Sequence, residues 1–274
     1  SGTFRVAHPL NGCWMHGESS TVRCVLSQAF SRMAWYKHWF GTRYYKLLYG
    51  HRDEEDARDW VEAILRAWSL HPGSRVLDLA CGRGRHVRWL LAAGMEATGI
   101  DISEASIAEA RSLMPGVDLR VQDMREPFAV ERYDAVVCLF TSLGYFDTIE
   151  DDRKVFAAVA GALKPGGRFV LDFMNSPLVL RDLVKHEELE REGVFFRIDR
   201  RLESGVLVKC VIVRDGDVEH HFEERVQALT PRELELMARE AGLVIEDRTD
   251  GPDLKPFDAR LSQRFVLWTR KPLA

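Results

Sequence analysis

A glycine loop that joins a short apolar strand to a helix constrains the fold of this 274-residue chain more than any other feature. The strand is expected at residues 75–79, and the loop follows at 80–84. A strand that is apolar on both faces is typical of a parallel sheet covered by helices on each side. Gly82 and Gly84 let a ligand approach the backbone, and the following helix offers free N–H groups. The sequence therefore predicts a ligand-binding α/β domain.

Strands and helices alternate regularly after this loop. Further strands are expected at 96–101, 117–121, 133–139 and 168–173, with helices near 85–93, near 103–113 and before Pro165. Such alternation implies right-handed crossovers and a doubly wound sheet. Two more strands are expected at 243–248 and 263–269. The prediction is a Rossmann-like, doubly wound, seven-stranded sheet.

The alternation stops between residues 188 and 229. Extended runs without a helix fill this region, at 194–202, 205–213 and 217–228, and Asp215-Gly216 between the last two is a strong hairpin signal. We therefore expect a three-stranded antiparallel β insertion at 188–229. The core is expected at 33–187 and 230–274, and residues 1–32 are expected to be a disordered tag or extension.

Composition excludes several classes of protein. Hydrophobic residues make up 46% of the chain and charged residues 29%, which is ordinary for a soluble globular protein. With 38 basic and 42 acidic residues, the net charge of −4 gives no global basic field for a long nucleic acid. Five cysteines without a CxxC pair indicate neither a disulfide framework nor a zinc site. We expect a cytoplasmic protein without a metal and without a membrane span.

The acid before the glycine loop helps to identify the ligand. A dinucleotide fingerprint has a third glycine that packs the helix against the strand, and Val87 occupies that place here. Asp78 would also repel a pyrophosphate, whereas it suits a ligand with an ammonium group. Both observations disfavour the alternative of a nicotinamide-dependent oxidoreductase.

The run at 76–86 resembles the first motif of the class I S-adenosylmethionine-dependent methyltransferases. Later segments resemble this family in order and spacing, namely Asp101, residues 121–124, 133–146 and 163–167. The resemblance implies an enzyme whose cofactor is S-adenosylmethionine and whose product is S-adenosylhomocysteine. It also implies that the insertion at 188–229 covers the acceptor site.

The resemblance implies a set of cofactor-binding residues. They are Tyr36, Tyr44, Arg52, Asp78, Ala80, Cys81, Gly82, Gly84, Asp101, Ile102, Asp123, Met124 and Leu139. Asp101 would accept both ribose hydroxyls, although it is also placed to cap the next helix. Asp78 has a similar alternative as a cap of the glycine loop. Asp123 would bind the adenine amino group, unless the backbone around Met124 reads the base.

The aromatic segment near the N-terminus has two interpretations. Tyr36, Tyr44 and Tyr45 could cover the sulfonium as a cation–π lid, with Arg52 pairing the cofactor carboxylate. Alternatively, the segment is a hydrophobic helix that packs on the sheet edge. The residues alone do not decide between these two.

The sequence identifies the acceptor only by class. No Asn-Pro-Pro-Tyr run follows the fourth strand, which argues against methylation of adenine in nucleic acid. We expect in-line transfer to an oxygen or nitrogen of a small molecule, with Tyr145 and His186 as candidate bases by position. An RNA methyltransferase, and a cofactor-binding protein without turnover, are the alternatives. The oligomeric state stays open, a homodimer included.

Overall fold

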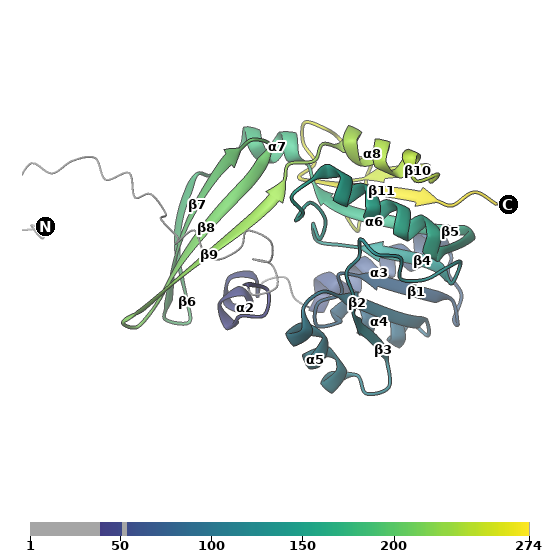
Figure 1. The fold of residues 1–274 in the computed structure, drawn as a ribbon, viewed down its shortest axis with the longest axis horizontal. Coiled ribbons are helices and arrows are strands. Elements are labelled where there is room, and N and C mark those ends of the chain that lie inside the picture. The colour runs from purple at the N-terminus through teal and green to yellow at the C-terminus, as the bar shows by residue number, and fades with distance from the viewer. Residues whose placement is uncertain (1–38, 51–53, 274) are drawn as a thin grey trace, which may run out of the picture. The chain divides into compact units, whose positions relative to one another are not determined.

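The computed structural model describes residues 39–50 and 54–273, all within the unit formed by Met33–Ala274. The expected extension at 1–32 lies outside the described residues. The central feature is a seven-stranded sheet in the order β10-β11-β5-β4-β1-β2-β3, which confirms the predicted fold class (Figure 1). Its strands are β1 (Arg75–Leu79), β2 (Glu96–Asp101), β3 (Asp118–Val121), β4 (Tyr133–Cys138), β5 (Leu163–Met174), β10 (Val244–Thr249) and β11 (Arg264–Arg270). β1 to β5 run parallel, whereas β11 is antiparallel to both β5 and β10.

Helices cover both faces of this sheet. One face carries α3 (Glu54–Trp68), α4 (Arg85–Ala92) and α5 (Glu104–Leu113), and the other carries α6 (Ile149–Ala162) and α8 (Pro231–Glu240). Side-chain caps begin several of them. Thr230 and Glu233 form a reciprocal capping box at α8, and Ser103 caps α5. α7 (Ser176–Arg181) leads to the second sheet.

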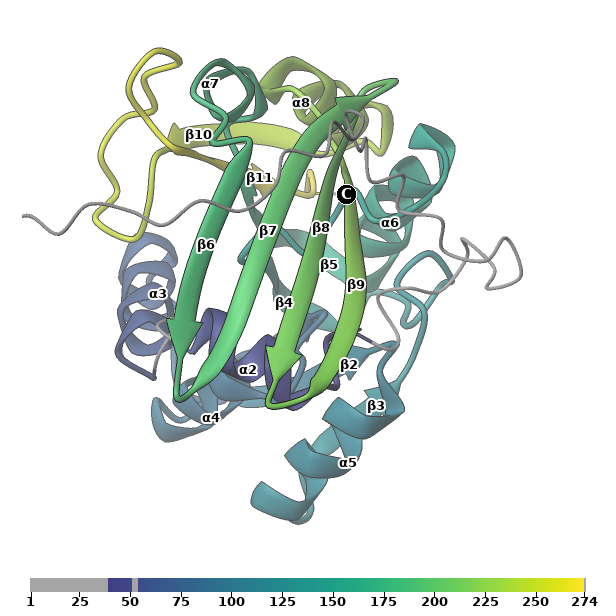
Figure 2. The ribbon, with the colours of Figure 1, turned by 90° about the vertical axis from the view of Figure 1, so that its left-hand side faces the viewer.

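The second sheet has four antiparallel strands rather than the three predicted (Figure 2). They are β6 (His186–Arg191), β7 (Val194–Glu203), β8 (Val206–Asp215) and β9 (Val218–Gln227). β6 was not predicted because Leu189 is its sole apolar residue. Its strand form comes from backbone pairing with β7, which the side chains do not reveal.

The helix α2 (Arg43–Tyr49) packs on one face of the second sheet. Trp39 and Leu48 join Phe196, Val211 and Val213 in a hydrophobic cluster. This cluster brings the aromatic segment of the sequence beside strands more than 140 residues later in the chain. In the described part of the chain, no helix is long and apolar enough to cross a bilayer.

Candidate active site

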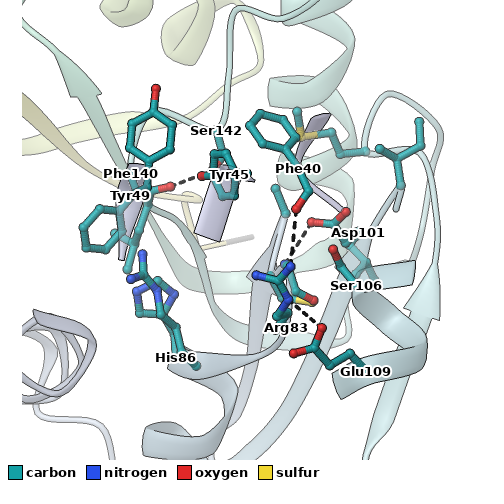
Figure 3. Close-up of a pocket in the computed structure, with 18 of the residues that line it drawn as sticks. Phe40, Tyr45, Tyr49, Arg83, His86, Asp101, Ser106, Glu109, Phe140 and Ser142 are labelled. Carbon is teal, nitrogen blue, oxygen red and sulfur yellow. Dashed lines mark hydrogen bonds and ion pairs between the residues drawn. The ribbon is translucent and has the colours of Figure 1, made fainter. Parts of the chain in front are cut away.

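A cavity of about 470 Å³ opens at the carboxyl ends of β1, β2 and β4 (Figure 3). Ligands of open α/β sheets bind at such ends because the loops there diverge. Its lining comes from the glycine loop, from residues that follow β2, β3 and β4, and from α2 with Phe40. The cavity therefore has two sides. The ends of β1, β2 and β4 with the loops after them form the strand-end side, and α2 with Phe40 forms the α2 side.

Gly82 and Gly84 in the loop have different structural roles. Ala80, Gly82 and Gly84 all have positive φ, and the loop is fixed to β2 by the Cys81 N–H, which donates to the Ile100 carbonyl at 3.0 Å. A Cβ on Gly82 would meet no described atom within 4 Å, so this glycine leaves open space at the cavity. A Cβ on Gly84 would come within 2.4 Å of Met114, which shows that Gly84 permits the approach of α5. Of the two, Gly82 provides room for a ligand.

Asp101 is the carboxylate best placed for a vicinal diol. Its Oδ2 accepts the Gly82 N–H at 2.9 Å, and its Oδ1 accepts the Ser103 N–H at 2.8 Å. Burial raises the pKa of Asp101, and these two hydrogen bonds oppose the rise. Each oxygen retains acceptor capacity, so the group fits the two hydroxyls of a ribose. Ile102 and Leu139 also line the cavity.

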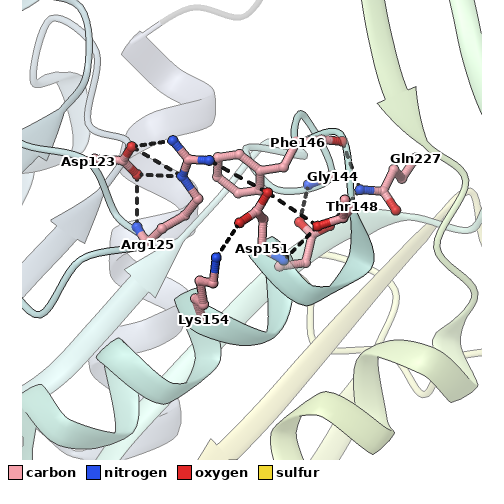
Figure 4. Close-up of polar contacts among 9 residues, drawn as sticks. Asp123, Arg125, Gly144, Phe146, Thr148, Asp151, Lys154 and Gln227 are labelled. Atoms are coloured by element: carbon pink, nitrogen blue, oxygen red, sulfur yellow. Dashed lines mark hydrogen bonds and ion pairs between the residues drawn. The ribbon is translucent and has the colours of Figure 1, made fainter. Parts of the chain in front are cut away.

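Asp123 reaches the cavity with an arginine already bound to it (Figure 4). Arg125 donates to Asp123 through its backbone N–H at 2.9 Å and through Nη2 at 2.6 Å. The Arg125 guanidinium lies 4.7 Å from the centre of the Phe146 ring. Met124 lies beside them in the lining. A carboxylate with two oxygens can still accept from an adenine amino group in this arrangement.

Asp78 lies behind the cavity wall rather than in it. The residue is 1% exposed, and the described lining includes its neighbour His86 instead. Asp78 Oδ2 lies 3.5 Å from His86 Nδ1. The His86 ring is stacked on Phe140, with ring centres 5.4 Å apart. His86 was not predicted as a site residue because a histidine in the first turn of a helix carries no signal of its own.

Of the predicted tyrosines that the structure describes, Tyr45 lines the cavity and Tyr44 does not. Tyr44 lies outside the described lining, and its hydroxyl bonds to Asp215 at 3.0 Å and His220 at 2.9 Å. Tyr45 and Tyr49 line the cavity instead. Residues four apart share a helix face, whereas adjacent residues do not. Tyr36 and Arg52 lie outside the described residues, so their roles stay predictions.

The two candidate bases fall in different places. Tyr145 lines the cavity, where its ring meets Phe40 edge to face at 5.6 Å. His186 lies on β6, is exposed, and bonds to Asp199 at 2.8 Å. The described lining does not include it. Cys81 also lines the cavity, and burial raises the pKa of its thiol well above the usual value, which disfavours a nucleophilic role.

A partly buried polar cluster fixes α2 to the second sheet. The Glu224 carboxylate on β9 accepts the Trp39 Nε1–H at 2.7 Å and the Tyr49 hydroxyl at 2.7 Å. Lys209 on β8 donates to the same Tyr49 oxygen. No sequence motif marks Lys209 or Glu224, because they come from strands far from α2 in the chain. The cluster sets where Tyr49 meets the cavity.

A second connection joins the loop after β4 to the end of β9 (Figure 4). Asp152 accepts the Gly144 N–H and the Gln227 side-chain amide, both at 2.9 Å. The Gln227 backbone N–H donates to the Gly144 carbonyl at 2.7 Å. Burial raises the pKa of Asp152 to about 7. Within the described residues, no group of three or more His, Cys, Asp or Glu side chains is arranged to hold a metal ion.

The known proteins that this chain resembles are methyltransferases. A family model described as a methyltransferase domain matches residues 76–167. A ubiquinone biosynthesis O-methyltransferase from Xanthomonas axonopodis pv. citri is 32% identical over 73% of this chain and 77% of the relative. A dTDP-3-amino-3,4,6-trideoxy-alpha-D-glucopyranose N,N-dimethyltransferase from Streptomyces venezuelae is 28% identical over 76% and 92%.

Solved structures agree on the fold. A methyltransferase from Clostridium acetobutylicum superposes with a TM-score of 0.73, at 23% identity, over 84% of this chain and 96% of that one. The Rossmann-like sheet, the strand-end cavity and these relatives point to one activity, methyl transfer to an oxygen or nitrogen of a small molecule. The chain belongs to the class I S-adenosylmethionine-dependent methyltransferases.

Proposed function

We propose that the acceptor is the amino group of a sugar carried by a nucleoside diphosphate. The relative from Streptomyces venezuelae acts by its name on such a compound, and the alignment spans 92% of its length. The observation that carries the proposal is a pair of basic side chains where α2 meets the glycine loop. Lys46 and Arg83 both bind the Glu109 carboxylate, and Arg85 also lines the cavity. Their N–H donors, beside aromatic rings, suit a diphosphate attached to a base.

The cofactor would occupy the strand-end side of the cavity. Asp101 is proposed to hold the ribose, and Asp123 with Met124 to meet the adenine. The open space before Gly82 would admit the methionine portion. Bound there, S-adenosylmethionine supplies a methyl group that its sulfonium already activates. The remaining task of the protein is to align the acceptor nitrogen with that methyl group, where effective molarities of about 10⁵–10⁸ M are available.

The acceptor would enter between α2 and the loop after β4. Tyr45, Tyr49 and Tyr145 line this side and bring aromatic rings to the space proposed for a sugar. Only a neutral amine attacks, so a proton must leave an acceptor that arrives as an ammonium ion. Tyr145 is the better placed of the two predicted bases, because His186 lies outside the described lining.

The experiment is a methylation assay with S-adenosylmethionine and three acceptors, followed by mass spectrometry. A dTDP-linked 3-amino sugar should gain one and then two methyl groups. The matched 3-hydroxy sugar nucleotide and a simple catechol should gain none. Methylation of the catechol alone would overturn the proposal and favour an oxygen acceptor, as in the Xanthomonas relative. Methylation of the hydroxy sugar would overturn the choice of nitrogen.

A further inference from the structure

The loop after β4 carries backbone strain where it lines the cavity. Phe140 has φ +59° and Thr141 has φ +58°, a left-handed conformation that side chains other than glycine disfavour. Two consecutive residues of this kind are uncommon, and they persist only where surrounding contacts hold them. Phe140 itself lines the cavity.

An ion pair with a buried carboxylate supplies those contacts. The Phe140 N–H donates to Asp172 Oδ2 at 2.8 Å, and the Thr141 N–H donates to the Asp172 carbonyl at 3.0 Å. Arg264 donates to both oxygens of the same carboxylate, with Nη2 2.5 Å from Oδ2. Asp172 is 0% exposed and lies on β5, while Arg264 begins β11. The last strand of the chain therefore helps to fix the strained turn.

The position of Phe140 in turn defines part of the cavity wall. Its ring is stacked on His86, and the guanidinium of Arg85 lies 4.3 Å from its centre. His86 covers the buried Asp78, whose Oδ2 has no hydrogen-bond partner among the described residues. A shift of Phe140 would expose this pair and change the cavity beside the glycine loop.

We propose that Asp172 and Arg264 act as positioning residues for the cofactor. They hold the left-handed turn at Phe140 and Thr141, and the turn holds the Phe140 ring in the wall of the cofactor cavity. Removing one partner of an ion pair that served stability alone would lower the free energy of unfolding without a specific effect on ligand affinity.

The test is calorimetric titration with S-adenosylhomocysteine, so it does not depend on the acceptor. Arg264→Gln should weaken binding about tenfold, since it removes the charged partner that fixes Asp172. Arg264→Lys keeps the charge, remains usable if the glutamine variant fails to fold, and should weaken binding about threefold. Arg248→Gln is the matched control. It breaks a similar pair with Glu235 away from the cavity, so it should lower the melting temperature without changing affinity.

A second substitution at the turn distinguishes a positioning role of the ion pair from a purely structural role. Thr141→Gly accepts a left-handed backbone without a Cβ clash, so the turn depends less on the ion pair. Added to Arg264→Gln or Arg264→Lys, it should recover about half or more of the lost affinity on a logarithmic scale. The proposal is overturned if folded Arg264 variants bind S-adenosylhomocysteine as the wild type does, or if Thr141→Gly recovers nothing. Neither result bears on the amino-sugar acceptor, which the methylation assay tests separately.

Discussion

The two sides of the active-site cavity differ in which parts of the chain hold their polar groups in place. On the strand-end side, backbone amides of neighbouring loops place Asp101, which accepts the N–H of Ser103 and the N–H of Gly82. On the α2 side, Tyr49 is placed by Glu224, a residue 175 positions later. The first side suits a ligand that never changes, and the second suits an acceptor that differs between relatives. With the proposed placement of the cofactor and the acceptor, we expect that their affinities can be changed separately.

The largest expected effect concerns Asp152, which connects the two sides through Gly144 and Gln227. Burial raises the pKa of Asp152 to about 7, above an unfolded value of about 3.9, so its protonated form favours the folded state. That stabilisation is complete below about pH 4 and is lost as the pH rises through about 7. Asp152→Asn stays neutral throughout. The wild type should therefore lose on the order of 3 kcal/mol relative to the variant between these pH values.

Urea unfolding at several pH values measures this difference. A difference that stayed constant with pH would mean that the Gly144 and Gln227 donors keep the carboxylate ionised. The two sides of the cavity would then be joined by a charge rather than by a neutral acid.

The strand-end side should respond most to Asp101→Asn. Loss of the charge weakens two hydrogen bonds within the loop as well as those to a ribose, so affinity for S-adenosylhomocysteine should fall about 100-fold. Calorimetric titration gives this value directly. Asp118→Asn on β3, outside the described lining, is the control and should bind as the wild type does. An equal loss of affinity for S-adenosylhomocysteine in both variants would contradict a local role for Asp101.

On the α2 side, Glu224→Gln should weaken binding of the acceptor and leave binding of the cofactor almost unchanged. The amide accepts less strongly from Trp39 and Tyr49, so the KM for the acceptor should rise about tenfold. Affinity for S-adenosylhomocysteine should stay within about twofold. Glu219→Gln on the same strand, which pairs with Arg214 in solvent, is the control. An equal loss of cofactor affinity in Glu224→Gln would break the separation of the two sides.

The smallest effect is expected for Gly82→Ala. The new methyl group would enter the open space at the cavity, on a backbone with φ +54°, and binding of S-adenosylhomocysteine should weaken about fivefold. Gly116→Ala is matched for positive φ, at +85°, and lies outside the described lining. Both variants should lose similar stability in thermal melts. Unchanged binding by Gly82→Ala would show that the ligand keeps clear of this glycine.

The strand-end side could be predicted well from the sequence because its strands, loops and acids follow patterns within short stretches of the chain. The alternation of strands and helices gave the seven-stranded sheet, and spacing pointed to Asp101 and Asp123, which both line the cavity. Asp78 was the exception. A strand-end acid looks the same in sequence whether it faces a ligand or a buried histidine.

The α2 side could not be predicted because its contacts join distant segments. Tyr44 and Tyr45 are adjacent, and only the packing of α2 on the second sheet decides which one meets the cavity. β6 lacks the alternation that marks a half-buried strand. The partners Lys209 and Glu224 are ordinary charged strand residues until the fold brings them to Tyr49.

The most direct test of the account is a crystal structure of the protein with S-adenosylhomocysteine bound. The account predicts both ribose hydroxyls within about 3.2 Å of the Asp101 carboxylate, with the adenine beside Asp123 and Met124. It also predicts that Tyr45, Tyr49 and Tyr145 border the space left for the acceptor. A ribose placed against the α2 tyrosines, with Asp101 free of the ligand, would contradict the division of the cavity into a cofactor side and an acceptor side.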